Sequence, residues 1–261
     1  MFPFDYIRPA SVTEAIAAHG QGEEPRYLAG GQSLLGALKL RLAAPSTLID
    51  LARLAELRGI RRDGACWVVG AGITHAEMAV GVEIPALAAL AGSIGDLQVR
   101  NMGTLGGALA NNDPAGDHAA GALGLGAEIR TDRRVIPADN FFLGMFETAL
   151  EPDEVIVEVS YPLPCRAGYA KLRNPASGYP VVGVFVAQTG GEAGVRVAVT
   201  GAGACVFRLP EFEAALEREF SPAALAGLSV PAGDLNRDLH ATAEYRAHLI
   251  GVLAGRAVAA S

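Results

Sequence analysis

Two glycine-rich segments constrain this chain more than any other feature: LAGGQSLL at residues 28–35 and GTLGGALANN at residues 103–112. Each follows a stretch of extended character and precedes small or apolar residues. Because glycine lacks a Cβ, consecutive backbone N–H groups can converge on one anion, and a helix start adds a favourable partial charge. The same glycines can equally make ordinary turns, as a lone Gly-Gly pair usually does. From these residues alone, two interpretations stay open: an anion-binding site without lysine, or a pair of ordinary turns.

The better-known phosphate-binding motifs are missing from the sequence. No GxxxxGK[ST] segment occurs, and GAGITH at residues 70–75 has His75 where a GxGxxG motif needs its third glycine. Thr74 and Glu77 instead have the spacing of a capping box, which predicts an ordinary strand-to-helix turn. A dinucleotide-binding domain of the Rossmann type is therefore not predicted.

Composition excludes several classes of protein. The chain has 261 residues, of which 51% are hydrophobic and 19% charged, as in a folded protein of one large or two ordinary domains. A net charge of -7 without a lysine or arginine cluster argues against nucleic acid and acidic membrane surfaces as partners. Three separated cysteines without CxxC argue against a disulfide framework and against an iron–sulfur cluster in this chain. No export signal or membrane span is recognisable, so a cytoplasmic protein is predicted.

Helix and strand patterns alternate in the first half. Capping boxes at Ser11/Glu14 and Thr74/Glu77 predict two helix starts, and an alanine-rich helix is expected near residues 85–91. PRYLAGGQSLLGALKLR moves from a strand through a glycine turn into a helix. Further strands are expected in STLIDL, in CWVVGAG and, as a pair around a charged turn, in GAEIRTDRRVIPADNFF.

The pattern of predicted secondary structure changes near residues 162–164, where a domain boundary is predicted. EVIVEVSYPLP alternates before it, and YAKLRN and YPVVGVFVAQTGGEAGVRVAVTGAG after it are typical of antiparallel strands with a GGEAG hairpin turn. From Pro210 onward, short amphipathic helices dominate.

No catalytic or metal-binding constellation can be argued from the residues. The histidines lack metal-ligand spacing such as HExxH, and GxSxG is absent. We therefore predict no catalytic residue and no metal ligand in this chain. All five histidines are interpreted as surface or structural residues: His19, His75, His118, His240 and His248.

Taken together, the two glycine segments are far more specific than either alone. YLAGGQSLLGALKLRLAAPSTLIDL, followed by IGDLQVRNMGTLGGALANNDPAGD, resembles the FAD-binding medium subunit of molybdenum hydroxylases, the family of carbon monoxide dehydrogenase and xanthine dehydrogenase flavoproteins. The resemblance covers essentially the whole chain, from FDYIRPASVTEAI through YAKLRNPASGYPVVGV to YRAHLIGVLAGRAV.

The resemblance implies an α+β fold in two domains. Residues 1–163 would form an FAD-binding domain of the vanillyl-alcohol-oxidase-like (PCMH) type, itself two α/β subdomains with the flavin between them. Residues 164–261 would form a small α/β C-terminal domain with a three-stranded antiparallel sheet and a helical bundle.

The resemblance also implies which residues contact FAD. Backbone N–H groups of the two glycine segments, together with the hydroxyls of Ser33 and Thr104, would surround the diphosphate. Substitution of Gly31 or Gly106 by valine is accordingly expected to abolish FAD retention, because a branched side chain blocks backbone approach. Asn111 and Asn112 could offer amide bonds nearby. The complete expected set of cofactor-binding residues is Leu28, Ala29, Gly30, Gly31, Gln32, Ser33, Leu34, Thr104, Leu105, Gly106, Gly107, Ala108, Asn111, Asp117, Val155, Lys171 and Tyr179.

Three of these residues have a competing structural interpretation. Asp117 matches a family acid that contacts the dinucleotide, but it could also be a helix N-cap. Lys171 matches a lysine near the flavin, where its charge would stabilise the anionic reduced form, but it could also be a solvated lysine. Tyr179 matches the position that covers a face of the isoalloxazine, although a tyrosine in a strand is more often core. Gln32 and Asp96 replace histidines of many relatives, so any detail that needs an imidazole there does not transfer.

The function implied by the resemblance is electron transfer. The flavin would accept electrons singly from two [2Fe–2S] clusters in a small subunit and pass them to an external acceptor. The molybdenum cofactor would lie in a large subunit that carries out hydroxylation, and the assembly is expected to be a dimer of heterotrimers. The alternative is a self-sufficient, non-covalent flavin oxidase or reductase of the same fold. The hydroxylated substrate and the acceptor do not follow from the sequence.

Overall fold

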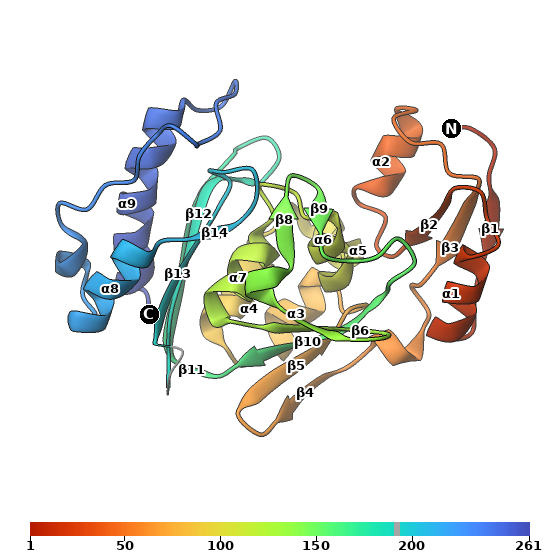
Figure 1. The fold of residues 1–261 in the computed structure, drawn as a ribbon, viewed down its shortest axis with the longest axis horizontal. Helices are drawn as coiled ribbons and strands as arrows, with labels where there is room; N and C mark the ends of the chain where they lie inside the picture. The colour runs from red at the N-terminus through yellow and green to blue at the C-terminus, as the bar shows by residue number, and fades with distance from the viewer. Residues whose placement is uncertain (191–193) are drawn as a thin grey trace.

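Three parts of the chain lie side by side along the long axis of the molecule (Figure 1). The structure is a computed structural model that describes residues 1–190 and 194–261, so the middle of the predicted GGEAG turn lies outside the described residues. Each part has its own sheet and its own cluster of buried apolar side chains.

The N-terminal part is a three-stranded parallel sheet in the order β1-β3-β2, made by Asp5–Ile7, Thr47–Asp50 and Pro25–Leu28, with α1 (Val12–His19) and α2 (Leu34–Lys39). The predicted strand, glycine turn and helix from residue 25 onward are confirmed. The capping box predicted for α1 is half wrong. Ser11 accepts the N–H of Glu14 at 3.1 Å, but the Glu14 carboxylate accepts the N–H of Ala10 instead of closing back on Ser11.

The central part is a five-stranded antiparallel sheet covered by helices. Its order is β4-β5-β10-β6-β7, formed by Ile60–Asp63, Cys66–Gly70, Ile156–Pro162, Glu128–Thr131 and Val135–Pro137. The helices are α3 (His75–Gly81), α4 (Pro85–Gly92), α5 (Leu97–Met102), α6 (Leu105–Asn111) and α7 (Asp117–Leu125), and β8 (Phe142–Gly144) and β9 (Glu147–Thr148) form a small hairpin. The predicted box at Thr74 and Glu77 is complete and begins α3. Two further turns of 3-10 helix lie at Ala55–Leu57 and Ala138–Asn140.

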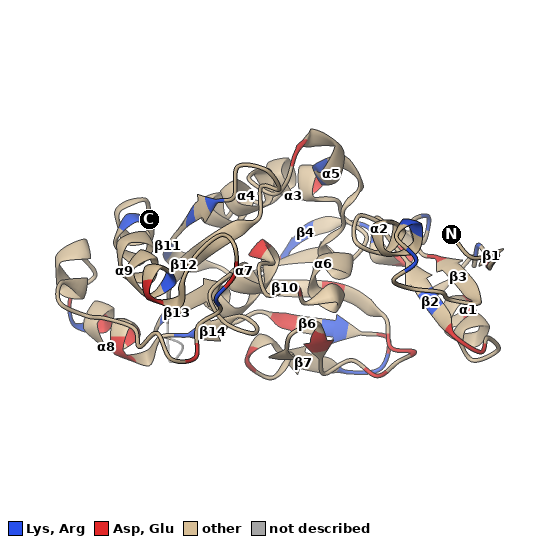
Figure 2. Cartoon of the chain, turned by 90° about the horizontal axis from the view of Figure 1, so that it is seen from above, with Lys and Arg blue, Asp and Glu red and all other residues tan. Residues whose placement is uncertain are grey.

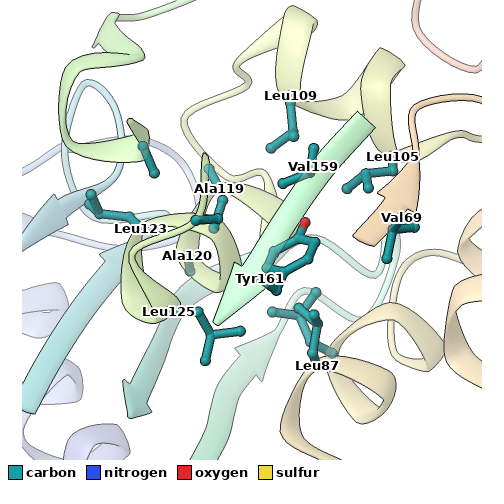
Figure 3. Packing of buried hydrophobic residues seen from close by; sticks show 14 of the residues in the cluster. Val69, Leu87, Leu105, Leu109, Ala119, Ala120, Leu123, Leu125, Val159 and Tyr161 are labelled. Carbon is teal, nitrogen blue, oxygen red and sulfur yellow. The ribbon is translucent and has the colours of Figure 1, made fainter. Parts of the chain in front are cut away.

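Tyr161 on β10 lies at the centre of the core of this part, among side chains from α4, α6 and α7 (Figure 3). Leu87, Leu105 and Leu123 are among its neighbours in the same buried cluster. Burial raises the pKa of the Tyr161 phenol, because the anion would have no water around it. The glycine-rich helix α6 is thus anchored in the core by its leucines, which fixes where its N-terminus lies.

The C-terminal part has a four-stranded antiparallel sheet in the order β11-β12-β13-β14, formed by Pro164–Arg173, Pro180–Thr189, Val195–Thr200 and Phe207–Arg208. The prediction of three strands is therefore wrong by one. The fourth has only two residues, too few to give an alternating pattern before the helix start at Pro210. Helices α8 (Pro210–Arg218) and α9 (Ala243–Ala259) and a 3-10 turn at Pro222–Leu225 pack against this sheet.

Strand β12 joins the two larger cores. Val182, Val184 and Val186 belong to the C-terminal cluster, whereas Phe185, which alternates with them, belongs to the central one. Side chains on successive strand residues point to opposite faces, so the sheet carries helices on both sides. Figure 2 shows acidic and basic residues scattered over all three parts. Within the described residues, no helix has the length and apolar character needed to span a membrane.

Candidate functional site

The two glycine segments, about 70 residues apart in the sequence, lie against each other in the structure. Gly30 packs on the backbone of Met102 and Gly103 so closely that a Cβ at Gly30 would overlap the Met102 carbonyl oxygen. Beside this contact, a Cβ on Gly107 would lie 3.7 Å from the Cβ of Ala29. Glycine at position 30 is therefore required for the approach of the two segments, whereas a Cβ at position 107 would make only an ordinary contact with Ala29.

The first glycine segment, residues 29–33, presents unpaired backbone donors. The N–H groups of Gly30, Gly31, Gln32 and Ser33 donate to no other group of the described chain. Gly31 has a φ of +71°, a left-handed conformation that turns consecutive N–H groups toward one side. Gln32 and Ser33 are exposed, and the Ser33 hydroxyl does not cap α2. These features fit an anion receptor between strand β2 and helix α2.

The second glycine segment, residues 103–107, has its glycine N–H groups bonded within the protein, although the resemblance implies that they contact the diphosphate. Gly106 and Gly107 lie in the first turn of α6, and the N–H of Gly106 donates to the Ala71 carbonyl at 2.8 Å. A Cβ on Gly106 would lie 2.6 Å from the Cβ of Ala71. Blocked approach of a ligand is therefore the wrong reason to expect an effect of Gly106→Val: valine would disturb the packing of α6 before it met any ligand.

Thr104 is the residue of this segment that keeps free polar groups. It begins α6 as the N-cap, where its hydroxyl accepts the N–H of Gly107 at 3.2 Å. Bonds on either side hold it against the turn before α3: the N–H of Leu105 donates to Ile73 at 2.9 Å, and the N–H of His75 donates to Gly103 at 3.0 Å. The N–H of Thr104 itself has no partner among the described residues.

Asp117 and Lys171 form a buried ion pair rather than surface groups. The Lys171 ammonium lies 2.7 Å from an Asp117 carboxylate oxygen, which also accepts the hydroxyl of Tyr169 at 2.6 Å. Lys171 further donates to the carbonyls of Ser93 and Gly178. Burial raises the pKa of Asp117, and the neighbouring ammonium counteracts that rise. Both structural alternatives are wrong, since Gly116 and not Asp117 is the N-cap of α7, and Lys171 is not solvated.

The ion pair is connected to the loop that carries Tyr179. That loop packs on residues 93–95, because a Cβ on Gly178 would lie 3.0 Å from Gly95, and α5 then leads from there to Gly103. Asp96 caps α5 by accepting the N–H of Val99 at 2.8 Å. Asp96 therefore has a structural role at the start of this helix.

Tyr179 itself is not core. It precedes β12, is 43% exposed, and lines a surface cavity of about 420 Å³ together with Phe146 and Met145. Partial burial and the nearby carboxylates of Asp113 and Asp117 raise the pKa of Tyr179. An aromatic ring in this half-exposed position can pack against a planar ligand.

The remaining predicted residues lie in two environments. Asn111 is half-buried at the end of α6, whereas Asn112 is a left-handed C-cap whose amide donates to the carbonyls of Gly144 and Glu147. Val155 is buried in the core of the N-terminal part. Asn112 and Val155 thus have clear structural roles. The other expected cofactor-binding residues lie in or directly beside the two glycine segments: Leu28, Ala29, Leu34, Leu105 and Ala108.

Sequence spacing missed one feature of this region, a pair of buried histidines. Nε2 of His118 and Nδ1 of His75 lie 2.9 Å apart, although the two residues are 43 positions apart in the chain. Burial lowers the pKa of His75 to about 4 and that of His118 well below its ordinary value. The structural interpretation of these two histidines holds, but no local motif signals that they pair. The described residues contain no group of three metal-ligating side chains, and all three cysteines are free.

Comparison with known proteins defines the class of this chain. Residues 2–164 match the family described as the FAD binding domain in molybdopterin dehydrogenase. The chain belongs to this family. It is 36% identical to the carbon monoxide dehydrogenase medium chain of Hydrogenophaga pseudoflava, over 99% of this chain and 96% of that one. It is 35% identical to the nicotine 6-hydroxylase medium subunit of Paenarthrobacter nicotinovorans, over 97% and 95%.

A solved structure supports the same assignment. Carbon monoxide dehydrogenase from Hydrogenophaga pseudoflava, in a form that lacks the Mo-pyranopterin moiety of its cofactor, contains a chain that superposes with a TM-score of 0.88 at 36% identity, covering 100% of this chain and 98% of that one. This protein is therefore an FAD-binding oxidoreductase chain of the molybdenum hydroxylase type. The free N–H groups and left-handed Gly31 of the first glycine segment fit the diphosphate of such a cofactor.

Proposed function

We propose that this chain is the medium, FAD-binding subunit of a heterotrimeric molybdenum hydroxylase. In this proposal a small subunit holds two [2Fe–2S] clusters, a large subunit holds the molybdenum cofactor, and two heterotrimers associate. The observation that carries the proposal is the similarity to medium chains over nearly the full length of this chain and of each relative. The three separated cysteines agree with it, because they offer no set of cluster ligands.

The glycine segments are the proposed diphosphate site. The first segment supplies backbone N–H groups from Gly30 to Ser33, and the second supplies the N–H and hydroxyl of Thr104. A hydrogen bond to a charged oxygen contributes about 1.5–3 kcal/mol, so several of them can hold a diphosphate without a lysine. Ser33 adds a hydroxyl that is free to turn toward the ligand.

The flavin ring is proposed to lie toward Tyr179. Its ring would cover one face of the isoalloxazine, while the Asp117–Lys171 pair fixes the adjoining loop through the Gly178 carbonyl. When bound, FAD supplies one- and two-electron redox chemistry, and the protein orients it and limits access to it. The cavity beside Tyr179 is the proposed approach for the external acceptor. In this arrangement none of the described residues acts as a catalytic acid or base.

The proposed domain division follows the same assignment. Residues 1–163 would form the PCMH-type FAD-binding domain with its two subdomains, and residues 164–261 the C-terminal domain. In support, the third sheet begins at Pro164, directly after β10 ends at Pro162. The compartment of the protein stays a prediction from the sequence.

The proposal is tested by producing the chain alone and together with a small and a large subunit encoded beside it. The isolated chain should bind FAD, release it on denaturation, and show no hydroxylase activity with aldehydes or heterocycles. The three chains should co-purify, and a substrate of the large subunit should then reduce the flavin. Hydroxylation by the purified single chain, free of molybdenum, would instead support a self-sufficient flavin enzyme.

A further inference from the structure

The buried histidine pair lies directly behind the second glycine segment. Gly103 has its backbone against His75, and a Cβ on Gly103 would lie 2.6 Å from Nε2 of that imidazole. Behind His75 lies His118, at a nitrogen–nitrogen distance of 2.9 Å. Gly103 also contacts Gly30 of the first segment, because a Cβ on Gly30 would lie 2.8 Å from the Gly103 Cα. A continuous column of contacts therefore runs from the first glycine segment through the second to the two imidazoles.

Both imidazoles are well enclosed, with exposures of 5% for His75 and 1% for His118. One hydrogen lies between them in any protonation state that keeps their bond. A neutral pair has one more hydrogen, on either outer nitrogen, whereas a cationic pair has hydrogens on both. Of these outer nitrogens, Nδ1 of His118 is buried without a partner, and Nε2 of His75 lies beside Gly103. An additional proton would therefore lie either on Nε2 of His75, beside Gly103, or on Nδ1 of His118, which has no partner among the described residues.

We propose that the His75–His118 pair is the positioning element of the second glycine segment, and that it takes up one proton from solvent when the FAD diphosphate binds. This inference rests on the proposed diphosphate site at the two glycine segments. In the free protein the pair is neutral near pH 7, and it supports Gly103 by packing and by the backbone bond from His75. Two negative charges at the glycine end of the column favour the cationic form of the pair at its other end.

Burial and the charged groups around the pair explain why it is neutral before binding. Burial is the main cause that lowers the pKa of both imidazoles, and Arg100 on α5 lowers that of His75 further. The pKa of His118 is lowered further by His75 itself and then by Lys171 on β11. Asp117, next to His118 in the chain, is already neutralised by Lys171 at 2.7 Å. The nearest hydroxyl, that of Tyr169, donates to the same carboxylate. Glu77 on α3 is engaged by Thr74 and Arg58. These carboxylates already have donors or cations as partners, so a bound diphosphate would add a new negative charge at the glycine end of these contacts.

The experiment measures protons taken up on binding. FAD is titrated into the apoprotein by calorimetry at pH 5.5 to 7.5, in buffers of different ionisation enthalpy, and ADP-ribose serves as a diphosphate diester without the flavin ring. Neither ligand has a group of its own that titrates in this range. We expect net proton uptake that grows as pH falls, approaching one proton, and a dissociation constant that falls by up to about tenfold for each unit by which binding raises the pKa of the pair.

Variants and spectra assign the proton to the pair. His118→Gln keeps a side chain that can bond His75 but cannot titrate as an imidazole, so proton uptake should be lost while FAD still binds. His248→Gln, at a histidine on α9 far from the pair in sequence and fold, should behave as the parent protein. Nitrogen NMR of labelled histidines in the unmodified holoprotein should show a cationic pair at pH 5.5, a measurement that does not depend on any variant folding.

Two negative results are distinguishable. FAD that binds the parent protein without proton uptake, with neutral imidazoles at pH 5.5, overturns the inference on the histidine pair. FAD that binds with unchanged affinity after Gly31→Val instead overturns the proposed location of the diphosphate, and the inference falls with it.

Discussion

The two glycine segments look alike in the sequence, but they are built in opposite ways. Residues 29–33 leave four successive N–H groups without a partner among the residues that the structure describes, and Gly31 adopts a left-handed conformation. In residues 103–107, by contrast, the N–H groups of Gly106 and Gly107 are bonded within the protein. The first segment is therefore organised to meet a ligand, whereas the second mainly supports the first and has free polar groups only at Thr104.

This difference shows that glycine is required for two separate physical reasons in one site: backbone conformation and close packing. Gly31 is required by its backbone conformation, whereas Gly30 and Gly106 are required because other backbone or Cβ atoms occupy the space where a side chain would be. A substitution at any of these positions can destabilise the apoprotein, so FAD affinity has to be compared among variants that remain folded.

The largest effect is expected for Gly30→Val, which breaks the contact between the two segments. The new side chain would overlap the carbonyl of Met102, so the segments must separate. We expect a loss of stability of about 1–3 kcal/mol in the apoprotein, and FAD affinity at least a hundredfold lower, about 2.7 kcal/mol. Urea unfolding and flavin fluorescence titration measure the two effects. Gly36→Ala is the matched control, since nothing lies within 4 Å of its Cβ position; an unchanged affinity in the valine variant would refute the contact.

A matched pair of alanine variants separates packing from ligand binding. Gly106→Ala should cost the apoprotein about 1–3 kcal/mol because its Cβ meets Ala71, while the folded protein binds FAD as before. Gly31→Ala should cost about 1–2 kcal/mol through the left-handed backbone, and should weaken FAD binding in addition. If both variants lose affinity equally at equal stability, the distinction between the two segments is wrong.

The histidine pair behind the second segment makes the apoprotein sensitive to acid. Both imidazoles have folded-state pKa values below the ordinary 6.5, so they are neutral in both states above that pH and contribute no difference. Below pH 6.5 the unfolded chain binds protons that the folded chain does not, so stability falls as pH decreases toward 4. At pH 5.5 the expected loss is about 1.4 kcal/mol per imidazole kept neutral. His118→Gln should flatten this part of the pH–stability curve; the same slope in parent and variant would contradict the assignment.

The two hydroxyls differ in the same way as the two glycine segments. Thr104→Val removes the N-cap of α6 and should cost about 0.5–2 kcal/mol. Ser33→Ala removes a hydroxyl that caps nothing, so the apoprotein should change by less than about 0.5 kcal/mol. Both variants are expected to bind FAD more weakly, which isothermal titration can measure. A large stability loss from Ser33→Ala would mean that the first segment is not open in the free protein.

The sequence alone predicted the order of elements and the flavin family, but not how the site is supported. Strand alternation, capping boxes and the two glycine motifs are local patterns, so they appear in a single sequence. The bond from Gly106 to Ala71, the Asp117–Lys171 pair and the histidine pair join residues 35 to 54 positions apart. Such pairings depend on how the elements pack, and a two-residue strand such as β14 has no pattern of its own.

A smaller effect on FAD affinity is expected at Tyr179, where the main consequence should be spectroscopic. The side chain is 43% exposed and precedes β12, so Tyr179→Ala removes only a partly buried ring and should cost the apoprotein about 1–2 kcal/mol, less than the roughly 3–5 kcal/mol typical of a core aromatic. Stacking on an aromatic ligand adds about 0.5–1.5 kcal/mol beyond area burial. The variant should therefore hold FAD more weakly by about that amount, with altered flavin absorbance and faster reaction with oxygen. Tyr179→Phe should restore most of the affinity, because it keeps the ring.

Tyr245 provides the control for this prediction, since it is exposed to a similar degree, 47%, but lies on α9 outside the cavity lining. Tyr245→Ala should leave the spectrum, the affinity and the oxygen reactivity unchanged. If Tyr179→Ala also leaves all three unchanged, the flavin ring does not lie against Tyr179. The diphosphate assignment would survive that result, because it rests on the free N–H groups of residues 30–33, which belong to another part of the molecule. An unchanged spectrum and unchanged FAD affinity in Tyr179→Ala would thus require a different position for the flavin ring, but not for the diphosphate.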